Sequence, residues 1–212
     1  MPPYLYLLIG LLSSWAFAQA PDSTSISQVL ATINQIDTFQ ATFLYTSKQA
    51  NGQEGQNPIK GQIWVKGQQY HLVLAEQVLI SNGQSIWTYL PQAHEVHISD
   101  EDPEQEAWNP AKLLTMHRKG FLPVACKTQF IDQESCDVVE WISQDSASAI
   151  IQINATVQQK DKKLKKIAAL DSHQVWHSFF VEEFELKEDL PDTCFEFDLA
   201  SYPDIEVIDL RE

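Results

Sequence analysis

The sequence has few basic residues. It contains 14 Lys and Arg against 29 Asp and Glu, a formal net charge of −15. Nucleic acids and anionic lipid headgroups repel such a chain, which excludes nucleic-acid binding and a flat position on an anionic membrane. Five of the basic residues lie between Lys160 and Lys166. Such a run is typical of a solvated turn, and a docking point for an acidic partner is the alternative.

The sequence also lacks the common catalytic motifs. It has no Gly-x-Ser-x-Gly, P-loop or Gly-x-Gly-x-x-Gly pattern. We therefore expect a protein that is not an enzyme and has no cofactor. A secreted hydrolase of unrecognised type is the alternative, and it would need polar groups converging in a cavity.

No apolar run is long enough to cross a bilayer comfortably, which takes about 20 residues. Residues 1–20 carry no charge and contain an apolar run, Tyr4 to Leu12, followed by Ala18-Gln19-Ala20. This pattern is typical of a cleaved signal peptide, although its start lacks Lys and Arg; an ordinary buried helix is the alternative. No lipid-anchoring cysteine follows the run. We expect residues 21–212 to form one soluble exported domain.

The three cysteines do not have the spacing of a zinc site, which needs close pairs. In an oxidising compartment an odd number leaves at least one without an intrachain partner. Cys126 and Cys136 flank a hairpin-like segment, so we expect a disulfide between them, with no bond at all as the alternative. His94 and His97 would point to opposite faces of a strand, and the acidic residues 100–106 lack the pattern of a calcium loop. No metal site is expected.

Two stretches have helical spacing and most of the rest reads as strands. The helices are expected over residues 25–38 and 110–119. Lys66-Gly67 and Asn82-Gly83 are turn signals. We expect about ten or eleven strands, a number and spacing typical of an antiparallel sandwich or barrel. They cover residues 39–47, 62–65, 69–74, 78–81, 85–90, 95–99, 127–131, 137–142, 149–157, 165–171 and 176–186.

Several segments, in order, resemble one known family. They are GQIWVK (61–66), YHL (70–72), VLISNGQSIWTY (78–89), EVHI (95–98) and NPAKLL (109–114), preceded by IDTFQATF (36–43). Together they resemble the outer-membrane lipoprotein carrier family LolA over roughly residues 25–125. The ending YPDIEVIDLR (202–211) looks like that of carriers from the Bacteroidetes-type branch.

The resemblance implies a mainly β fold with a few helices, an unclosed antiparallel β-barrel whose hydrophobic cavity is covered by a helical lid. It implies a periplasmic chaperone that binds the acyl chains of lipoproteins and carries them from the inner to the outer membrane. The implied partners are acylated lipoproteins, an inner-membrane exporter and possibly an outer-membrane acceptor, and we expect a monomer. Many members have an arginine after W-V-K that holds the lid shut. Gly67 stands there, so lid closure must use other contacts.

Strand alternation and helical spacing supply candidate lipid-binding residues. The wall candidates are Trp64, Tyr70, Leu72, Ile80, Trp87 and Tyr89. The lid candidates are Ile26, Val29, Leu30, Ile33, Leu113, Leu114 and Met116. Alternation alone does not fix which sheet face lines the cavity. Two further alternatives stay open: a lipid- or lipoprotein-sensing regulator on the same fold, and a purely structural core without ligand space.

Overall fold

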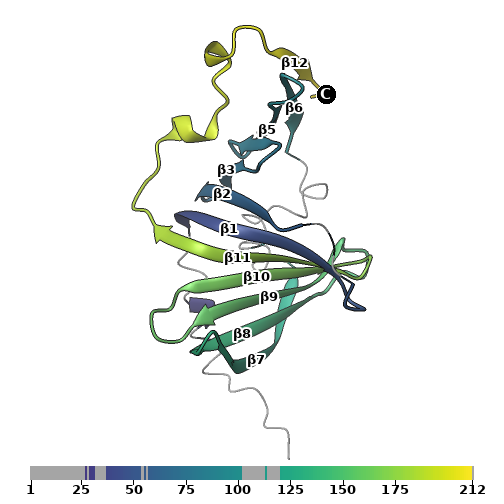
Figure 1. Ribbon diagram of the computed structural model, residues 1–212, viewed down its shortest axis with the longest axis vertical. Helices are drawn as coiled ribbons and strands as arrows, with labels where there is room; N and C mark the ends of the chain where they lie inside the picture. Colours follow the sequence, from purple (N-terminus) through teal and green to yellow (C-terminus); the bar gives the residue numbers. More distant parts are fainter. Residues whose placement is uncertain are drawn as a thin grey trace, which may run out of the picture.

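The residues that the structure describes form one sheet of twelve strands, whose arrangement Figure 1 shows. The computed structural model describes residues 27, 29–31, 37–53, 55, 57–101, 113 and 120–211. The strands are β1 (Thr38–Gln49), β2 (Ile59–Lys66), β3 (Gln69–Val73), β4 (Val78–Ser81), β5 (Ser85–Leu90), β6 (Glu95–Asp100), β7 (Phe121–Ile131), β8 (Glu134–Ser143), β9 (Ile150–Gln158), β10 (Leu164–Asp171), β11 (Val175–Leu186) and β12 (Glu206–Asp209).

The sheet is open. Its order is β12-β6-β5-β4-β3-β2-β1-β11-β10-β9-β8-β7, so β12 and β7 are edge strands and the described residues do not close a barrel. All pairs are antiparallel except β12 with β6, which is parallel. The fold is therefore mainly β and unclosed, as expected, with one more strand than the upper end of the sequence prediction. No helix among the described residues is long and apolar enough to cross a membrane.

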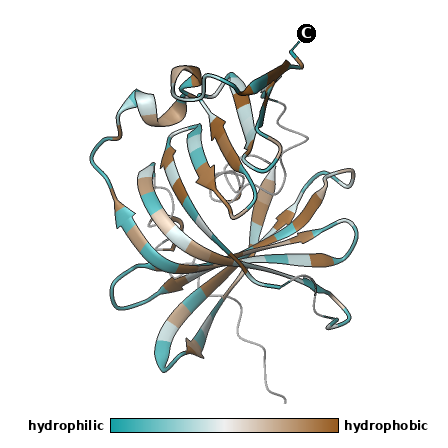
Figure 2. Ribbon diagram, turned by 45° about the horizontal axis from the view of Figure 1, so that its top comes forward, coloured by the Kyte–Doolittle hydropathy of each residue, from teal (hydrophilic) through white to brown (hydrophobic). Residues whose placement is uncertain are grey.

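Alternating residues give each strand two chemically different faces, visible as alternating colours in Figure 2. On β1, Phe39, Ala41 and Phe43 are buried, and Phe39 and Ala41 pair with Val65 and Ile63 of β2. We call the face that carries these residues the inner face. The outer face carries the residues between them.

A β-bulge keeps the inner face of β11 continuous with that of β1. Thr42 pairs with Glu183 and Phe43 with Val181, which leaves Glu182 as the extra residue. Val181 and Phe184 are three positions apart, yet both therefore contact the inner-face core.

The core lies on the inner face and includes residues from both halves of the sheet. Tyr70 of β3, Phe43 of β1 and Trp141 of β8 belong to one hydrophobic cluster. Val29 and Leu113 also belong to it, although neither is in a strand; both are helical. Figure 1 shows the short helical segment near Val29 behind the half of the sheet that contains β8–β11.

The two expected helices are described only in part. Ser27, residues 29–31 and Leu113 are helical. The helix expected over residues 25–38 is wrong at its end, because β1 begins at Thr38. β7 begins at Phe121, six residues earlier than the expected 127. The helical lid as a whole lies largely outside the described residues.

After β11 the chain returns along the outer face of the other half of the sheet. This C-terminal segment (187–211) contains two short 3-10 helices, η1 (Asp192–Phe195) and η2 (Leu199–Ser201), before β12. Figure 1 shows it in yellow, running from the end of β11 past β2 and β3 to the β6 edge. Sequence periodicity did not predict β12 as a strand.

Candidate functional site

The inner face carries a large apolar surface. Its described residues come from strands in both halves of the sheet and from two helical positions, and they include Phe39, Phe43, Ile63, Val65, Tyr70, Leu72, Val139, Trp141, Ile153, Ile167 and Phe179. Val29 and Leu113 are 2% and 1% exposed within this cluster, and Leu30 packs against it. The helical residues therefore occupy apolar space over the sheet.

A small cavity lies within the part of this core that the structure describes. A cavity of about 20 Å³ lies between β1, β2, β10 and β11 and is lined only by apolar side chains, among them Phe39, Phe43 and Phe179. This is about the room that one water-sized sphere needs. An apolar ligand of any length needs more room than this cavity offers.

A larger groove opens at one end of the sheet. Its volume is about 910 Å³, and it is bordered by the β1–β2, β3–β4 and β5–β6 loops. Ile59, Leu74 and Leu90 supply apolar surface, and Leu74 also packs against the inner-face cluster. Gly61 lies beside Phe43 and Leu74: a Cβ there would overlap Phe43 Cζ and lie 2.9 Å from Leu74 Cδ2. The groove thus adjoins the apolar core near Gly61, a position with no room for a larger residue.

The strand register separates the six predicted wall residues. Tyr70 and Leu72 are buried on the inner face and belong to its cluster. Trp64, Ile80, Trp87 and Tyr89 lie on the outer face: Trp64 pairs across the strands with His71, His71 with Ile80, and Ile80 with Trp87. One sheet face does not carry all six, so their grouping as one wall is wrong.

The C-terminal segment packs against part of this outer face, at β3 and β5. Tyr89 lies 5.5 Å from Phe197 and 5.0 Å from Tyr202 between ring centroids. His71 Nδ1 lies 3.0 Å from the carbonyl oxygen of Cys194. Phe195 of η1 is 0% exposed. Tyr89, which the sequence suggested as cavity lining, therefore packs against the chain's own C-terminal segment.

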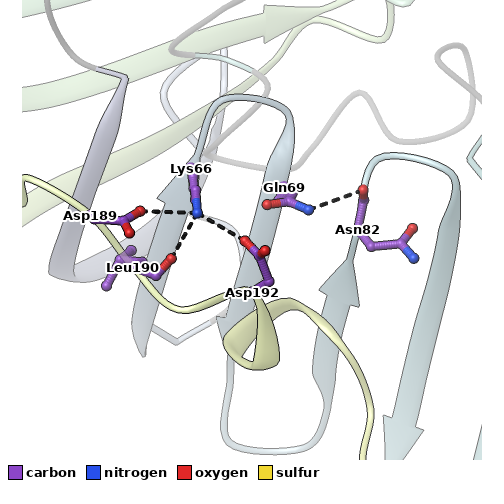
Figure 3. Close-up of polar contacts among 6 residues, drawn as sticks. All are labelled: Lys66, Gln69, Asn82, Asp189, Leu190 and Asp192. Atoms are coloured by element: carbon purple, nitrogen blue, oxygen red, sulfur yellow. Dashed lines mark hydrogen bonds and ion pairs between the residues drawn. The ribbon is translucent and has the colours of Figure 1, made fainter.

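One lysine fastens that segment to β2. Lys66 Nζ lies 2.9 Å from Asp189 Oδ1 and 2.8 Å from Asp192 Oδ1, and donates to the Leu190 carbonyl oxygen at 2.9 Å (Figure 3). The two carboxylates raise the pKa of Lys66, and Lys66 lowers that of Asp189. Separately, the Gln69 side chain donates to the Asn82 carbonyl oxygen in the neighbouring turn.

Three polar residues form a chain across β1, β11 and β10, near the end of β10 and the start of β11. Tyr45 Oη is 2.8 Å from His177 Nδ1, and His177 Nε2 is 3.4 Å from Asp171 Oδ2. A carboxylate only accepts, so Nε2–H donates to Asp171 and Nδ1 accepts from Tyr45 in the neutral ring. Burial lowers the pKa of His177, against the opposing effect of Asp171. Burial likewise raises the pKa of Tyr45.

The cysteines and histidines do not form the sites that were considered for them. The expected Cys126–Cys136 disulfide is wrong, because Cys126 pairs with Val139 while Cys136 pairs with Gln129, three positions along the β7–β8 hairpin. That offset, at about 3.4 Å per residue, exceeds disulfide reach. His97 Nε2 contacts Glu95 Oε2 at 3.0 Å. No metal-binding group of three or more such residues occurs in the described part of the chain.

The amino-acid sequence matches the model of a known protein family over most of its length. The model described as "Outer membrane lipoprotein carrier protein LolA" matches residues 34–198. The chain belongs to the LolA family. No curated protein sequence matches it.

Several solved structures are similar to this chain at low sequence identity. An uncharacterized conserved protein from Thermus thermophilus is 11% identical with a TM-score of 0.54, covering 87% of this chain and 99% of that one. A LolA superfamily protein from Nitrosomonas europaea is 15% identical (TM-score 0.45; 82% and 99% covered). MucB is 12% identical (TM-score 0.48; 89% and 67% covered). At these identities the likeness to the Thermus protein shows the fold alone.

The LolA-like W-V-K segment has a role that the sequence did not reveal. Val65 is in the inner-face core, Trp64 is on the outer face, and Lys66 holds the C-terminal segment. Gly67 follows in a turn with φ of 60°, and its N–H donates to the Asp37 carbonyl oxygen at 2.9 Å. Apart from its own chain neighbours, no atom of a described residue lies within 4 Å of the place where a Cβ would be at Gly67.

Most inner-face residues of this LolA-family chain were missed as site candidates. Phe39 and Phe43 fall within the strand predicted over residues 39–47 but were not proposed as lining. Trp141 and Phe179 lie in the second half of the chain, beyond the clearest resemblance. The signal available in the sequence was the alternation of apolar and polar residues along β1. Of the lid candidates, Val29, Leu30 and Leu113 lie in or against the core, while Ile26, Ile33, Leu114 and Met116 lie outside the described residues.

Proposed function

We propose that this protein is a periplasmic carrier that binds the acyl chains of lipoproteins on its inner face and carries them between the inner and outer membranes. The observation that carries the proposal is the occupation of the apolar inner face by helical Val29 and Leu113, in a chain whose residues 34–198 match the LolA family. In this proposal the cargo replaces these side chains.

The energy of burying acyl chains supports a mechanism in which the cargo replaces helical side chains on the inner face, rather than one in which it fills an existing cavity. Burying an acyl chain gains about 0.8 kcal/mol per CH₂, so several chains favour a large dry surface. The present cavity of about 20 Å³ takes none of them. Removing Val29, Leu30 and Leu113 from the core exposes apolar area that the acyl chains then cover. The gain from the cargo is offset by the loss of these contacts, which keeps binding reversible.

The groove at the end of the sheet is the proposed entrance. It is about 910 Å³ in volume and adjoins the core at Leu74 and Gly61. Its mixed lining of apolar side chains and Gln77, Gln92 and Asn57 suits a ligand with an apolar tail and a polar end. Acyl chains would enter here while the attached polypeptide stays outside.

The remaining parts of the proposal follow the family. Residues 1–20 act as a cleaved signal peptide, and the mature protein works in the periplasm as a monomer and not as an enzyme. An inner-membrane exporter supplies the acylated lipoprotein and an outer-membrane acceptor receives it. Residues 1–26 lie outside the described residues.

The test is release of lipoproteins from inner-membrane vesicles by the mature protein. Soluble one-to-one complexes are expected with the natural chain, and none with Leu30→Glu or Leu113→Glu. The matched control is Leu122→Glu, since Leu122 on the β7 edge strand is 51% exposed and does not line the proposed entrance. Acyl-chain binding without release would favour the regulator. Neither binding nor release would leave the inner face as ordinary core.

A further inference from the structure

A second concave site lies on the outer face, across β2, β1 and β11. Its volume is about 330 Å³. The floor consists of Gln40 and Thr42 of β1. In register, Gln40 lies between Trp64 and Glu185, and Thr42 lies between Gln62 and Glu183. One wall is therefore aromatic and the other acidic, and neither belongs to the inner face.

The acidic wall has one more negative than positive charge. The bulge in β11 presents Glu182 and Glu183 close together, followed by Glu185. Glu182 pairs with Lys60 at 2.8 Å and Glu185 with Lys187 at 2.7 Å. Glu185 also accepts from Gln40 Nε2 at 3.0 Å. Glu183 makes no hydrogen bond or ion pair with a described residue, although it lies close enough to Lys60 to raise the pKa of that lysine. With three carboxylates against two lysines, this wall can neutralise one further cation.

The opposite wall offers the aromatic ring of Trp64. The charge of Lys66, two positions along β2 on the same face, is balanced by Asp189 and Asp192. Trp64 lines the groove, and its ring centroid lies 5.3 Å from that of His71. Burial lowers the pKa of His71, which therefore stays neutral and does not repel a cation at neutral pH. β2 and β11 are two strand spacings apart, about 10 Å. A cationic side chain fits between them, with the indole on one side and a carboxylate on the other.

We propose that this outer groove binds a Lys or Arg side chain from a basic segment of a partner protein. Trp64 contacts the cation through its ring, Glu183 accepts its N–H groups, and Gln40, Gln62 and Thr42 supply further polar contacts. The net charge of −15 draws a basic segment towards the protein. Anionic membranes are repelled by the same field. The proposal does not depend on lipid binding by the inner face.

The experiment titrates the mature, isotope-labelled protein with the peptide acetyl-Gly-Ser-Arg-Gly-Arg-Ser-Gly-amide and follows backbone and indole N–H resonances. Its control peptide carries citrulline in place of both arginines, which keeps the shape and removes the charge. The arginine peptide is expected to shift the Trp64 indole signal, assigned with Trp64→Phe, and the amides around Thr42 and Glu183. The citrulline peptide is expected to shift neither.

Matched variants separate the groove from general charge attraction. Glu183→Gln and Glu140→Gln each remove one charge, but Glu140 lies on β8, away from the groove. Glu183→Gln is expected to weaken binding roughly threefold to tenfold and Glu140→Gln hardly at all. Thermal melts check that both variants fold. If Glu183→Gln does not fold, Trp64→Phe takes its place, with the same expected weakening.

Three results overturn the proposal: equal binding of the citrulline peptide, equal effects of the two Glu variants, or shifts confined to other acidic surfaces. A fourth concerns the occupant. Sedimentation analysis that shows concentration-dependent self-association, lost in Lys160→Glu/Lys162→Glu/Lys163→Glu, would make a second copy of this chain the ligand and overturn a separate partner.

Discussion

The ammonium group of Lys66 and the carboxylate of Asp192 form a 2.8 Å ion pair between residues 126 positions apart in the chain. Asp189 and the Leu190 carbonyl oxygen complete the contact. Because β2 is near the middle of the sheet, this lysine ties the C-terminal segment to a rigid part of the fold. From this contact onward the segment lies over the outer face, where Phe197 and Tyr202 pack against Tyr89.

Lys66→Met is expected to loosen the C-terminal segment without unfolding the sheet, because it removes the shared donor of two carboxylates and one carbonyl. Amide hydrogen exchange at residues 189–202 should become severalfold faster, while β8–β10 stay protected. Lys60→Met is the control, since Lys60 is also on β2 but pairs with Glu182 of β11. Equal protection in both variants would contradict the role given to Lys66.

Stability is expected to fall as the pH decreases through the range around 6.5, the usual pKa of histidine. Burial lowers the pKa of His71 and His177, so the unfolded chain binds protons there that the folded chain does not. More protons on the unfolded state mean lower stability at lower pH. Melting temperatures between pH 5 and 8 test this. His177→Gln should flatten the dependence, and identical curves would contradict it.

Gly61→Ala is expected to destabilise the fold by about 1–3 kcal/mol, as overpacking of a core does. The added Cβ would overlap Phe43 Cζ and lie 2.9 Å from Leu74 Cδ2. Urea denaturation measures the change. Phe43→Leu in the Gly61→Ala background should recover part of the loss relative to Phe43→Leu alone. Strict additivity of the two changes would show that the contact is not the cause.

Leu72→Asn and Ile80→Asn separate the two faces of the sheet. Both residues are 5% exposed and lie on neighbouring strands, but Leu72 faces the inner side and Ile80 the outer side. Both variants should lose stability. Only Leu72→Asn should also weaken fatty-acid binding, by about tenfold from burying an amide beside the ligand. Fluorescent fatty-acid titration under conditions where both variants are folded is the measurement. Equal weakening would argue against an inner-face site.

All three cysteines are expected to carry thiols. Alkylation under denaturing, non-reducing conditions should add three labels, because Cys126 and Cys136 are not paired in the β7–β8 hairpin. In the folded protein, Cys136 should react most slowly, since it is buried and burial raises its pKa. Labelling of only one cysteine would instead support a disulfide between the other two.

Local patterns were sufficient for much of the sheet. The bounds predicted for β4 and β5, residues 78–81 and 85–90, agree with the structure, because β-branched and aromatic residues flank a clear turn at Asn82-Gly83. The family resemblance predicted the unclosed β architecture. The end of the first helix was wrong because residues 36–38 suit either helical spacing or the alternation of β1.

The sequence by itself determined most of the strands, the charge and the family, because these follow from local side-chain patterns and from the order of motifs along the chain. Only the tertiary structure decided which face of the sheet is the inner one. Trp64 and Val65 are adjacent and both apolar, so alternation places them on opposite faces without saying which is covered. The covers are distant in sequence: helical Val29 and Leu113 on the inner face, and the segment held by Lys66 on the outer face.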